Sequence, residues 1–439
     1  MTVKGKSVES TRGAIAASRA RKPRFRSENI RLNTLARDRR TAPNRQQSQW
    51  TRAPPCPTQC GVRIADGPRT GWTTPTTLAR RGHVTTLDGL RGIAVLLVLL
   101  THVPAAMLLH AHRFAHHAAH MGGYLGVDIF FVLSGYLITR ILLVDARNGV
   151  PLRGFYARRL LRIFPIYYLV LALHAVVRLT PAVGWSAAYL SNYYFAVTRA
   201  PSLLSHTWSL AVEEHFYLLW PVLLRILKPS HHKPACLLLI GASLAASCAI
   251  VLSGTRMAES LVYAGTQSRM LSLCAGGAVA LYHPGDPERV SWRQRGWLLG
   301  LGGVGVALAV GLAFARSPWA FVVNAAAFAA VSVGLLMTAL DAFVAGRATS
   351  RVLCSWALRR TGRISYGLYL YHPFVYSFVL GHPTLGIVGR AARLPMALQL
   401  VTAVMASFVL ATLSFVLIEK PLLGLRRQVP AGPAAREAS

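Results

Sequence analysis

Apolar stretches with few charged residues recur along the chain between residues 84 and 425. Most are long enough, at about 17–25 residues, to cross the hydrocarbon core of a bilayer as an α-helix. The pattern predicts such helices over residues 87–109, 122–144, 163–180, 209–228, 235–253, 268–283, 297–315, 318–340, 364–383 and 397–418. The aromatic stretch over residues 183–198 could form an eleventh or a re-entrant segment. We therefore expect an all-α polytopic membrane protein with about ten transmembrane helices.

The polar stretches at both ends predict tails rather than folded domains. Residues 1–83 are rich in Arg, Ser, Thr, Pro and Gln and lack a sustained apolar period, which is typical of disorder. They do not resemble a signal peptide, because no short apolar core follows the basic stretch. The predicted organisation is a basic disordered cytoplasmic tail over 1–83, a transmembrane domain over 84–425 and a short cytoplasmic tail over 426–439.

The composition agrees with a membrane protein. Hydrophobic residues make up 53% of the 439 residues, charged residues only 14%, and the mean hydropathy is +0.40. The net charge of +33 could indicate a nucleic-acid partner. The Lys and Arg residues of the predicted loops, however, fall mostly on one side, as the positive-inside rule expects. The basic charge therefore indicates topology, with both termini cytoplasmic, and predicts a lipid bilayer rather than a nucleic acid as partner.

Ionisable residues lie within or at the ends of the apolar segments. They are Asp88, Arg91, His102, Asp128, Arg140, Glu213, Glu214, His215, Arg225, Arg269 and His372. Ionisable groups at membrane depth are costly and mark functional sites. A purely structural scaffold is therefore excluded, and we expect the helical bundle to bind, move or modify something polar.

The predicted topology separates two kinds of group. Arg91 and His102 are about three helical turns apart on one face of the first helix, with Arg91 at the cytoplasmic end. Asp128, Glu213 and Glu214 fall in the outer third of their helices, so we expect them near His102 and opposite the arginines. A neutral His can take the proton of a hydroxyl, and arginines can hold the phosphates of a coenzyme A thioester. This layout favours acyl transfer.

Seven blocks of sequence then follow one another in the order of a known family. They are LDGLRGIAVLLVLLTH (87–102), GYLGVDIFFVLSGYLITRILL (123–143), FYARRLLRIFPIYYLVL (155–171), HTWSLAVEEHFYLLWP (206–221), RMLSLCAGGAVA (269–280), ISYGLYLYHP (364–373) and IEKPL (418–422). Together they resemble the acyltransferase-3 family of bacterial membrane O-acyltransferases. The resemblance covers roughly residues 84–425.

The resemblance implies a multi-pass protein of the bacterial inner membrane that moves an acyl group, often acetyl, from a cytoplasmic acyl-CoA. The implied acceptor is a hydroxyl of a carbohydrate or glycosylated molecule, such as a surface polysaccharide, a lipid-linked sugar, peptidoglycan or a macrolide. Some family members carry a C-terminal SGNH esterase-like domain. We expect none in this chain, so that any second step would need a separate partner.

The resemblance also assigns roles to residues. The family's Arg-x10-His pair corresponds to Arg91 and His102, and its RxxR-like element to Arg159 and Arg162. We expect these three arginines to bind the donor and His102 to act as the catalytic base.

The acidic residues supply further candidates. The family's acidic pair corresponds to Glu213 and Glu214, and Glu214 or Asp128 would assist His102. Adjacent glutamates point about 100° apart on a helix, so we expect only one, Glu214, to face the site. Glu213 would then bind substrate or pair with Arg225 or Arg269, and Arg269 is itself a candidate for acceptor binding.

Other features allow alternative interpretations. Ser134 could carry a covalent acyl group, although small residues in such helices mostly serve packing. His110, His112, His116, His117 and His120 resemble a metal cluster, but their spacing fits no tight ligand set, and we predict no metal. Tyr366, Tyr369 and Tyr371 are expected to form an interfacial aromatic belt.

One alternative function belongs to another class. Intramembrane charges are also typical of a secondary transporter or exporter of a polar substrate. Transporters often contain internal repeats, and the two halves of this chain show no convincing correspondence. The sequence thus favours the acyltransferase.

Overall fold

The computed structural model describes residues 84–102, 112–283, 292–314, 317–345, 348–381, 389 and 394–425. All of them belong to one compact unit, Pro55–Ser439. This part of the chain is helical and contains no strand, which confirms the all-α prediction. The predicted tails over 1–83 and 426–439 lie outside the described residues, and so do the side chains of the histidine-rich stretch around His116.

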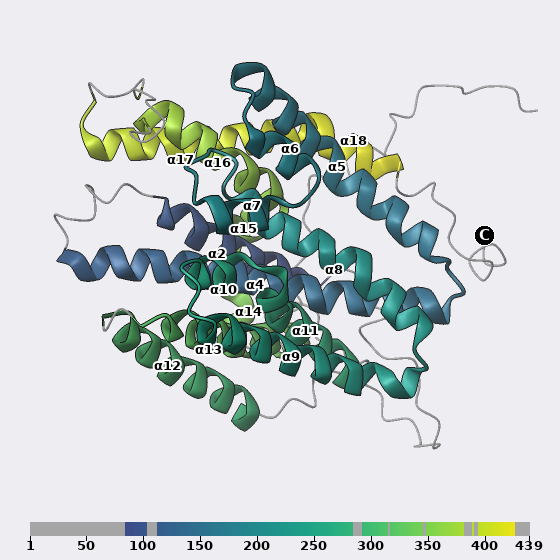
Figure 1. The fold of residues 1–439 in the computed structure, drawn as a ribbon. Helices are drawn as coiled ribbons and strands as arrows, with labels where there is room; N and C mark the ends of the chain where they lie inside the picture. Colours follow the sequence, from purple (N-terminus) through teal and green to yellow (C-terminus); the bar gives the residue numbers. More distant parts are fainter. Residues whose placement is uncertain are drawn as a thin grey trace, which may run out of the picture. The chain divides into compact units, whose positions relative to one another are not determined.

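Each predicted transmembrane segment coincides with one long helix (Figure 1). These helices are α2 (Thr85–Thr101), α4 (His112–Arg147), α5 (Leu152–Val177), α8 (Thr207–Ile226), α9 (Pro229–Leu252), α11 (Thr266–Tyr282), α12 (Trp292–Phe314), α13 (Trp319–Ala345), α16 (Ser365–Leu380) and α17 (Met396–Ser414). Shorter helical elements connect or extend them: α6 (Pro181–Ala187), α7 (Ser191–Thr198), α10 (Ala258–Ala264), α14 (Ala348–Leu353), α15 (Trp356–Arg363), the π-helical η5 (Phe415–Glu419) and α18 (Lys420–Leu425).

Among the described residues, 6 helices are long and apolar enough to cross a membrane. They are α4, α5, α9, α12, α13 and the continuous stretch from α17 into α18. The remaining long helices, α2, α8, α11 and α16, are shorter or more polar, and they carry most of the ionisable residues singled out above. A multi-pass membrane protein is therefore supported, whereas the count of about ten spans and the cytoplasmic termini stay predictions.

The aromatic stretch over 183–198 does not form an eleventh spanning helix. It contains α6 with 7 residues and α7 with 8, and at about 1.5 Å per residue neither can cross a bilayer. The backbone between them turns at Tyr189, whose φ of 54° is left-handed and ends a right-handed helix.

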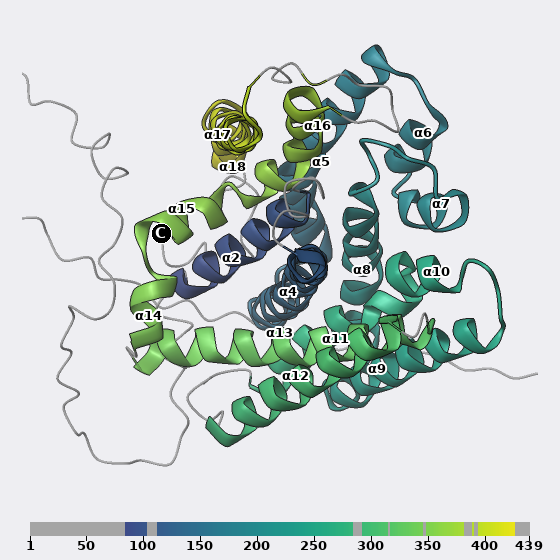
Figure 2. The ribbon, with the colours of Figure 1, turned by 90° about the vertical axis from the view of Figure 1, so that its left-hand side faces the viewer.

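Helix α4 occupies the centre of the bundle. It packs against α2, α8, α11 and α13, and Figure 2, which looks along its axis, shows these helices around it. On the side of α2 away from α4 lies α15, and α16 packs against α17 and α5. Helix α12 contacts the bundle mainly through α13. Side chains of α2, α4, α5, α8 and α16 can therefore converge on one region.

Two glycines allow α4 and α11 to approach each other closely. A Cβ on Gly135 would overlap the backbone carbonyl of Leu273, and one on Gly276 would overlap that of Val132. Small residues at helix crossings permit such backbone contact in membrane proteins. The crossing brings Asp128 on α4 against Arg269 and Ser272 on α11.

Helix α2 ends earlier than its apolar pattern predicts. The pattern predicts a helix over 87–109 with His102 beyond mid-membrane, but α2 ends at Thr101 and His102 is its C-terminal cap. The hydroxyl of Thr101 donates to Leu97 O and His102 Nδ1 bonds Val98 O at 3.0 Å. The imidazole thereby satisfies one of the carbonyls that the helix end leaves without a backbone partner. The imidazole is thus exposed at the end of the helix rather than buried along its side.

Candidate active site

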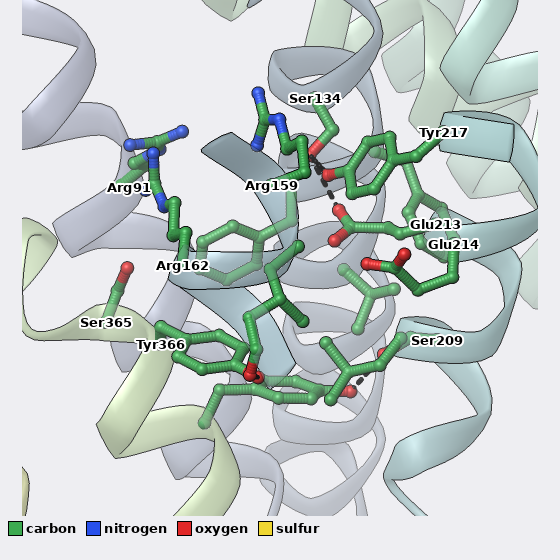
Figure 3. A pocket seen from close by; sticks show the side chains of 16 residues that line it. Arg91, Ser134, Arg159, Arg162, Ser209, Glu213, Glu214, Tyr217, Ser365 and Tyr366 are labelled. Atoms are coloured by element: carbon green, nitrogen blue, oxygen red, sulfur yellow. Dashed lines mark hydrogen bonds between the residues drawn. The ribbon is translucent and has the colours of Figure 1, made fainter. Parts of the chain in front are cut away.

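A cavity of about 100 Å³ lies between α2, α4, α5, α8 and α16. We call it the central cavity. Figure 3 shows Arg91 and Arg162 on one side of it and Glu213 and Glu214 on the other, with Arg159 between them beside Ser134 and Tyr217. The polar side chains that line it are Arg91, Ser134, Arg159, Arg162, Ser209, Glu213, Glu214, Tyr217, Ser365, Tyr366 and Tyr369. The arginines and the acidic pair selected from the sequence are therefore brought together.

The arginines come from two helices. Arg91 projects from α2, and Arg159 and Arg162, three residues apart, lie on neighbouring positions of one face of α5. The guanidinium of Arg159 lies 5.0 Å from the ring centroid of Tyr217 and 5.8 Å from that of Phe155. Cation–π contacts of this kind hold a guanidinium in place.

Both glutamates line the central cavity, so the expectation that only one could face the site is wrong. Their Cα–Cβ bonds diverge as expected, but each side chain has enough rotatable bonds to converge on the same space, as Figure 3 shows. Glu213 accepts a hydrogen bond of 2.7 Å from Ser134 Oγ, which in turn accepts one of 3.0 Å from the Tyr217 hydroxyl. Ser134 is therefore part of a hydrogen-bonded chain that orients Glu213.

A second cavity of about 350 Å³ contains His102. We call it the histidine chamber. His206 also lines it, together with the aromatic residues Tyr124, Phe195, Trp208, Tyr263 and Tyr369 and the hydroxyl residues Thr101, Ser205 and Ser260. Val127 and Tyr369 line both the histidine chamber and the central cavity, so the two spaces adjoin at these side chains. The Tyr369 hydroxyl is held by hydrogen bonds to Ser209 Oγ and to His206 O, the latter at 2.9 Å.

Three imidazoles gather beside this chamber. The ring centroids of His102 and His372 are 4.6 Å apart, and those of His206 and His372 are 5.8 Å apart. His372 is 0% exposed and its Nδ1 bonds Leu368 O. Three imidazole nitrogens make no hydrogen bond to another described residue: Nδ1 and Nε2 of His206 and Nε2 of His372. Of these three imidazoles, those of His102 and His206 line the chamber.

His206 was not among the site residues predicted from the sequence. It stands in the loop just before α8, outside every predicted apolar segment, and so is not one of the ionisable residues at membrane depth. The available signal was its position as the first residue of the HTWSLAVEEHFYLLWP block.

The expected meeting of His102 with the carboxylates is not found. Glu213 and Glu214 lie with the arginines, whereas Asp128 accepts hydrogen bonds from Ser272 and, at 3.1 Å, from Arg269. The glutamates line the cavity together with Arg91, near the start of α2, whereas His102 caps the other end of that helix.

A third cavity of about 230 Å³ continues the series on the other side of the arginines. We call it the entry cavity. Arg91, Arg162, Ser365 and Tyr366 line both it and the central cavity. Its other polar lining residues are Asp88, Arg363 and Glu419. Entry cavity, central cavity and histidine chamber thus follow one another, with cationic groups at one end and imidazoles at the other.

The tyrosines of α16 do not form an interfacial belt. Tyr369 and Tyr371 are 7% and 8% exposed, and the hydroxyl of Tyr371 bonds Ser414 inside the bundle. Tyr366 donates to Ile163 O and lines the two cationic cavities. An aromatic belt would face lipid headgroups, whereas these side chains form internal walls.

Comparison with known proteins gives consistent relatives. The family model described as an acyltransferase domain matches residues 84–418. The chain is 32% identical over 374 residues to the peptidoglycan O-acetyltransferase OatA of Listeria monocytogenes, an alignment that covers 79% of this chain and 57% of that protein. It is 31% identical over 376 residues to the putative peptidoglycan O-acetyltransferase YrhL of Bacillus subtilis, covering 77% and 55%.

The matched region is only part of these relatives. The chain spans little more than half of the length of either protein. No solved structure matches the chain.

Proposed function

We propose that this chain, which belongs to the acyltransferase-3 family, is a membrane O-acetyltransferase acting on a carbohydrate hydroxyl. The donor would be acetyl-CoA from the cytoplasm, and the protein would reside in a bacterial inner membrane. One observation carries the proposal: a cavity lined by Arg91, Arg159 and Arg162 adjoins a chamber lined by His102. Arginines that can bind a phosphorylated donor and an imidazole that can deprotonate a hydroxyl therefore lie in neighbouring cavities.

The donor would enter through the entry cavity, with its phosphates on the arginines. Guanidinium groups bind phosphate oxygens in pairs and keep their charge when partly buried, which suits Arg91 and Arg162 at the junction of two cavities. The pantetheine arm would then lie in the central cavity. Glu213 and Glu214 offer acceptors there for its amide N–H groups. The thioester would reach the junction at Val127 and Tyr369.

The protonation of His102 follows from its hydrogen bond. Nδ1 bonds a backbone carbonyl, Val98 O, which can only accept, so in the neutral ring Nδ1 carries the hydrogen. Nε2 then carries the lone pair and can accept the proton of an acceptor hydroxyl in the chamber. The freed oxygen attacks the thioester carbonyl, the C–S bond breaks, and the thiolate of coenzyme A takes up the proton. No covalent acyl-enzyme is required.

The acidic residues take other places than the ones first expected. Within the described residues neither Glu214 nor Asp128 makes a hydrogen bond to His102, whereas the ring of His372 lies 4.6 Å from it. We therefore assign Glu213 and Glu214 to the donor and Asp128 to the support of Arg269. His372 positions the catalytic imidazole by packing against its ring.

The test is the release of coenzyme A by the protein in nanodiscs, with acetyl-CoA and soluble peptidoglycan fragments. These fragments are chosen because the relatives above are named as peptidoglycan O-acetyltransferases. His102→Ala should slow acceptor-dependent release by about 100-fold or more, because general base catalysis is lost. Arg162→Ala should raise the KM for acetyl-CoA by about tenfold, the loss of one charge-assisted contact.

Matched controls come from the same protein. His231 and Arg153 are exposed, and Arg153 lies on α5 with Arg159 and Arg162. His231→Ala and Arg153→Ala should leave both constants within about twofold, as surface changes do. Full activity in a folded His102→Ala protein would refute the proposed base, and failure of the folded protein to bind any acyl-CoA would refute the enzyme itself.

A further inference from the structure

We propose that the histidine chamber binds one uncharged sugar ring of the acceptor, stacked on an aromatic wall formed by Tyr124, Trp208 and Tyr263, with His206 holding a hydroxyl of that ring. The inference rests on the proposed function for the identity of the reaction. It concerns binding, however, and can be tested without the donor.

The rings of the aromatic wall lie against one another although they come from three helices, with their planes tilted by 53° and 50°. The ring of Tyr263 on α10 lies 4.8 Å from that of Tyr124 on α4 and 4.7 Å from that of Trp208 on α8. All three residues line the histidine chamber. A pyranose has a face of C–H groups and a rim of hydroxyls, so it packs an apolar side on aromatic rings while its rim seeks hydrogen bonds.

A buried ion pair braces this wall from behind. The guanidinium of Arg269 lies 5.0 Å from the ring centroid of Tyr263 and 5.7 Å from that of Trp208. It also donates to Tyr263 O and pairs with Asp128 at 3.1 Å. Neither charged residue is among those that line the chamber. Arg269 and Asp128 are therefore positioning residues, which fix the angle of the rings that meet the sugar.

The chemistry of the lining favours an uncharged ligand. The described residues that form it include no Lys, Arg, Asp or Glu, and its polar groups are hydroxyls and the imidazoles of His102 and His206. A charged sugar would lose its hydration there without gaining an opposite charge, which is costly. The volume of about 350 Å³ lies at the small end of the range of ligand pockets, roughly 300–1,000 Å³. A single substituted ring suits such a space.

The imidazole of His206 lines the chamber and can bond a ligand hydroxyl. Its side chain is 5% exposed and neither ring nitrogen has a partner among the described residues, whereas its backbone oxygen is held by Tyr369. A buried imidazole without partners is unfavourable, and a ligand hydroxyl would relieve that cost. One nitrogen can donate and the other accept, so His206 can hold a ring hydroxyl while His102 takes the proton of the reacting one.

The test is saturation-transfer NMR of the protein in nanodiscs without acetyl-CoA. The probes are the methyl glycosides of N-acetylglucosamine, of glucosamine and of glucuronic acid, each at millimolar concentration. We expect transfer to the ring C–H protons of the neutral glycoside and little to the cationic or anionic one. Equal transfer to all three, or none to the neutral one, would overturn the inference.

Paired variants identify the wall. Trp208→Leu should reduce the transfer to the neutral glycoside by about tenfold, whereas Trp185→Leu, at a tryptophan that is 45% exposed on α6, should not. Tyr124→Leu is the second variant, because Tyr124 is only half-buried and its replacement leaves the packed core intact. Unchanged saturation transfer in both chamber variants would refute the aromatic wall.

The brace and His206 are tested by kinetics. Arg269→Met should raise the KM for the acceptor with little change in the KM for acetyl-CoA, and Arg269→Lys should restore part of the acceptor affinity.

His206→Leu should weaken acceptor binding more than His206→Gln, which keeps a donor and an acceptor. Equal losses for acceptor and donor in all of these variants would refute the assignment. Sugar binding without acetyl transfer would refute the proposed function but not the sugar site. Acetyl transfer that is unaffected by the variants of the chamber would refute the sugar site but not the proposed function.

Discussion

At the scale of single residues, the ion pair between Arg269 and Asp128 is deeply buried. The side chains of Arg269 and Asp128 are only 6% and 1% exposed, compared with 16% and 19% for those of Arg158 and Asp145. Removing one partner of a buried pair leaves an uncompensated charge, which costs about 3–5 kcal/mol. Pairs closer to the solvent are screened by it and contribute less.

Asp128→Asn should therefore lower the thermal unfolding temperature in detergent strongly, and Asp145→Asn only slightly. The double variant Asp128→Leu with Arg269→Met should recover most of the loss, because it removes both charges together. The measurement is unfolding followed by intrinsic fluorescence. Equal effects of the two single variants would show that the buried pair stabilises the protein no more than the pair of Arg158 and Asp145 does.

Ser134 allows a second prediction at this scale. It bridges Tyr217 and Glu213, so it orients a carboxylate and need not carry an acyl group. Ser134→Ala should keep acetyl transfer within about tenfold of the wild type, because only the hydrogen bonds that orient Glu213 and Tyr217 are lost. Mass spectrometry after incubation with acetyl-CoA should find no acetyl group on the Ser134 peptide. Complete loss of activity together with an acylated serine in the wild type would establish the covalent route instead.

At the same scale, the sequence predicted which arginines and glutamates gather, but not what lies beside His102. The grouping of Arg91, Arg159 and Arg162 follows from helical spacing and from family resemblance. The contact of His102 with His372 joins α2 to α16, and no local pattern encodes a distance between such remote segments. The pairing of Asp128 with Arg269 depends likewise on how two helices cross.

At the scale of elements, the crossing of α4 and α11 holds the site together. Gly135 and Gly276 each face the backbone of the other helix without room for a Cβ, whereas Gly241 on α9 has open space around it. Gly276→Ala should force the helices apart and cost about 1–3 kcal/mol or more. Gly241→Ala should be neutral.

Size-exclusion chromatography and thermal unfolding in detergent measure this difference. The Gly276→Ala protein should also lose acceptor affinity, because Arg269 and Asp128 lie on the two displaced helices. Unaltered stability of Gly276→Ala would mean that the helices do not touch at this point.

Apolar length predicted the positions of the long helices well, since that signal is local and strong. It failed where side chains end an element early. The imidazole of His102 bonds a carbonyl in the last turn of α2, and Tyr189 adopts a left-handed φ between α6 and α7. An apolar run cannot reveal either event.

At the scale of the whole molecule, the positive-inside rule places the loop after α4 in the cytoplasm and the loop after α9 outside. Asn148 and Ser253 are exposed in these two loops. In intact cells a membrane-impermeant maleimide should label Ser253→Cys readily and Asn148→Cys only after permeabilisation. The native cysteines described in the structure are buried or half-buried and should react slowly. Labelling of both variants without permeabilisation would overturn the assigned orientation.

The serial arrangement of entry cavity, central cavity and histidine chamber has an electrical consequence. Under the proposed reaction coenzyme A stays on one side of the bilayer and the sugar on the other, and only the acetyl group moves outward past Val127 and Tyr369. The hydroxyl proton leaves the sugar as the acetyl group arrives, and it ends on the thiol of coenzyme A. The acetyl group moves outward as the equivalent of an acylium cation, and one proton moves inward in exchange. No net charge therefore crosses the membrane. Membrane voltage then neither drives nor opposes a turnover, and collapse of the potential with an ionophore should leave the rate unchanged.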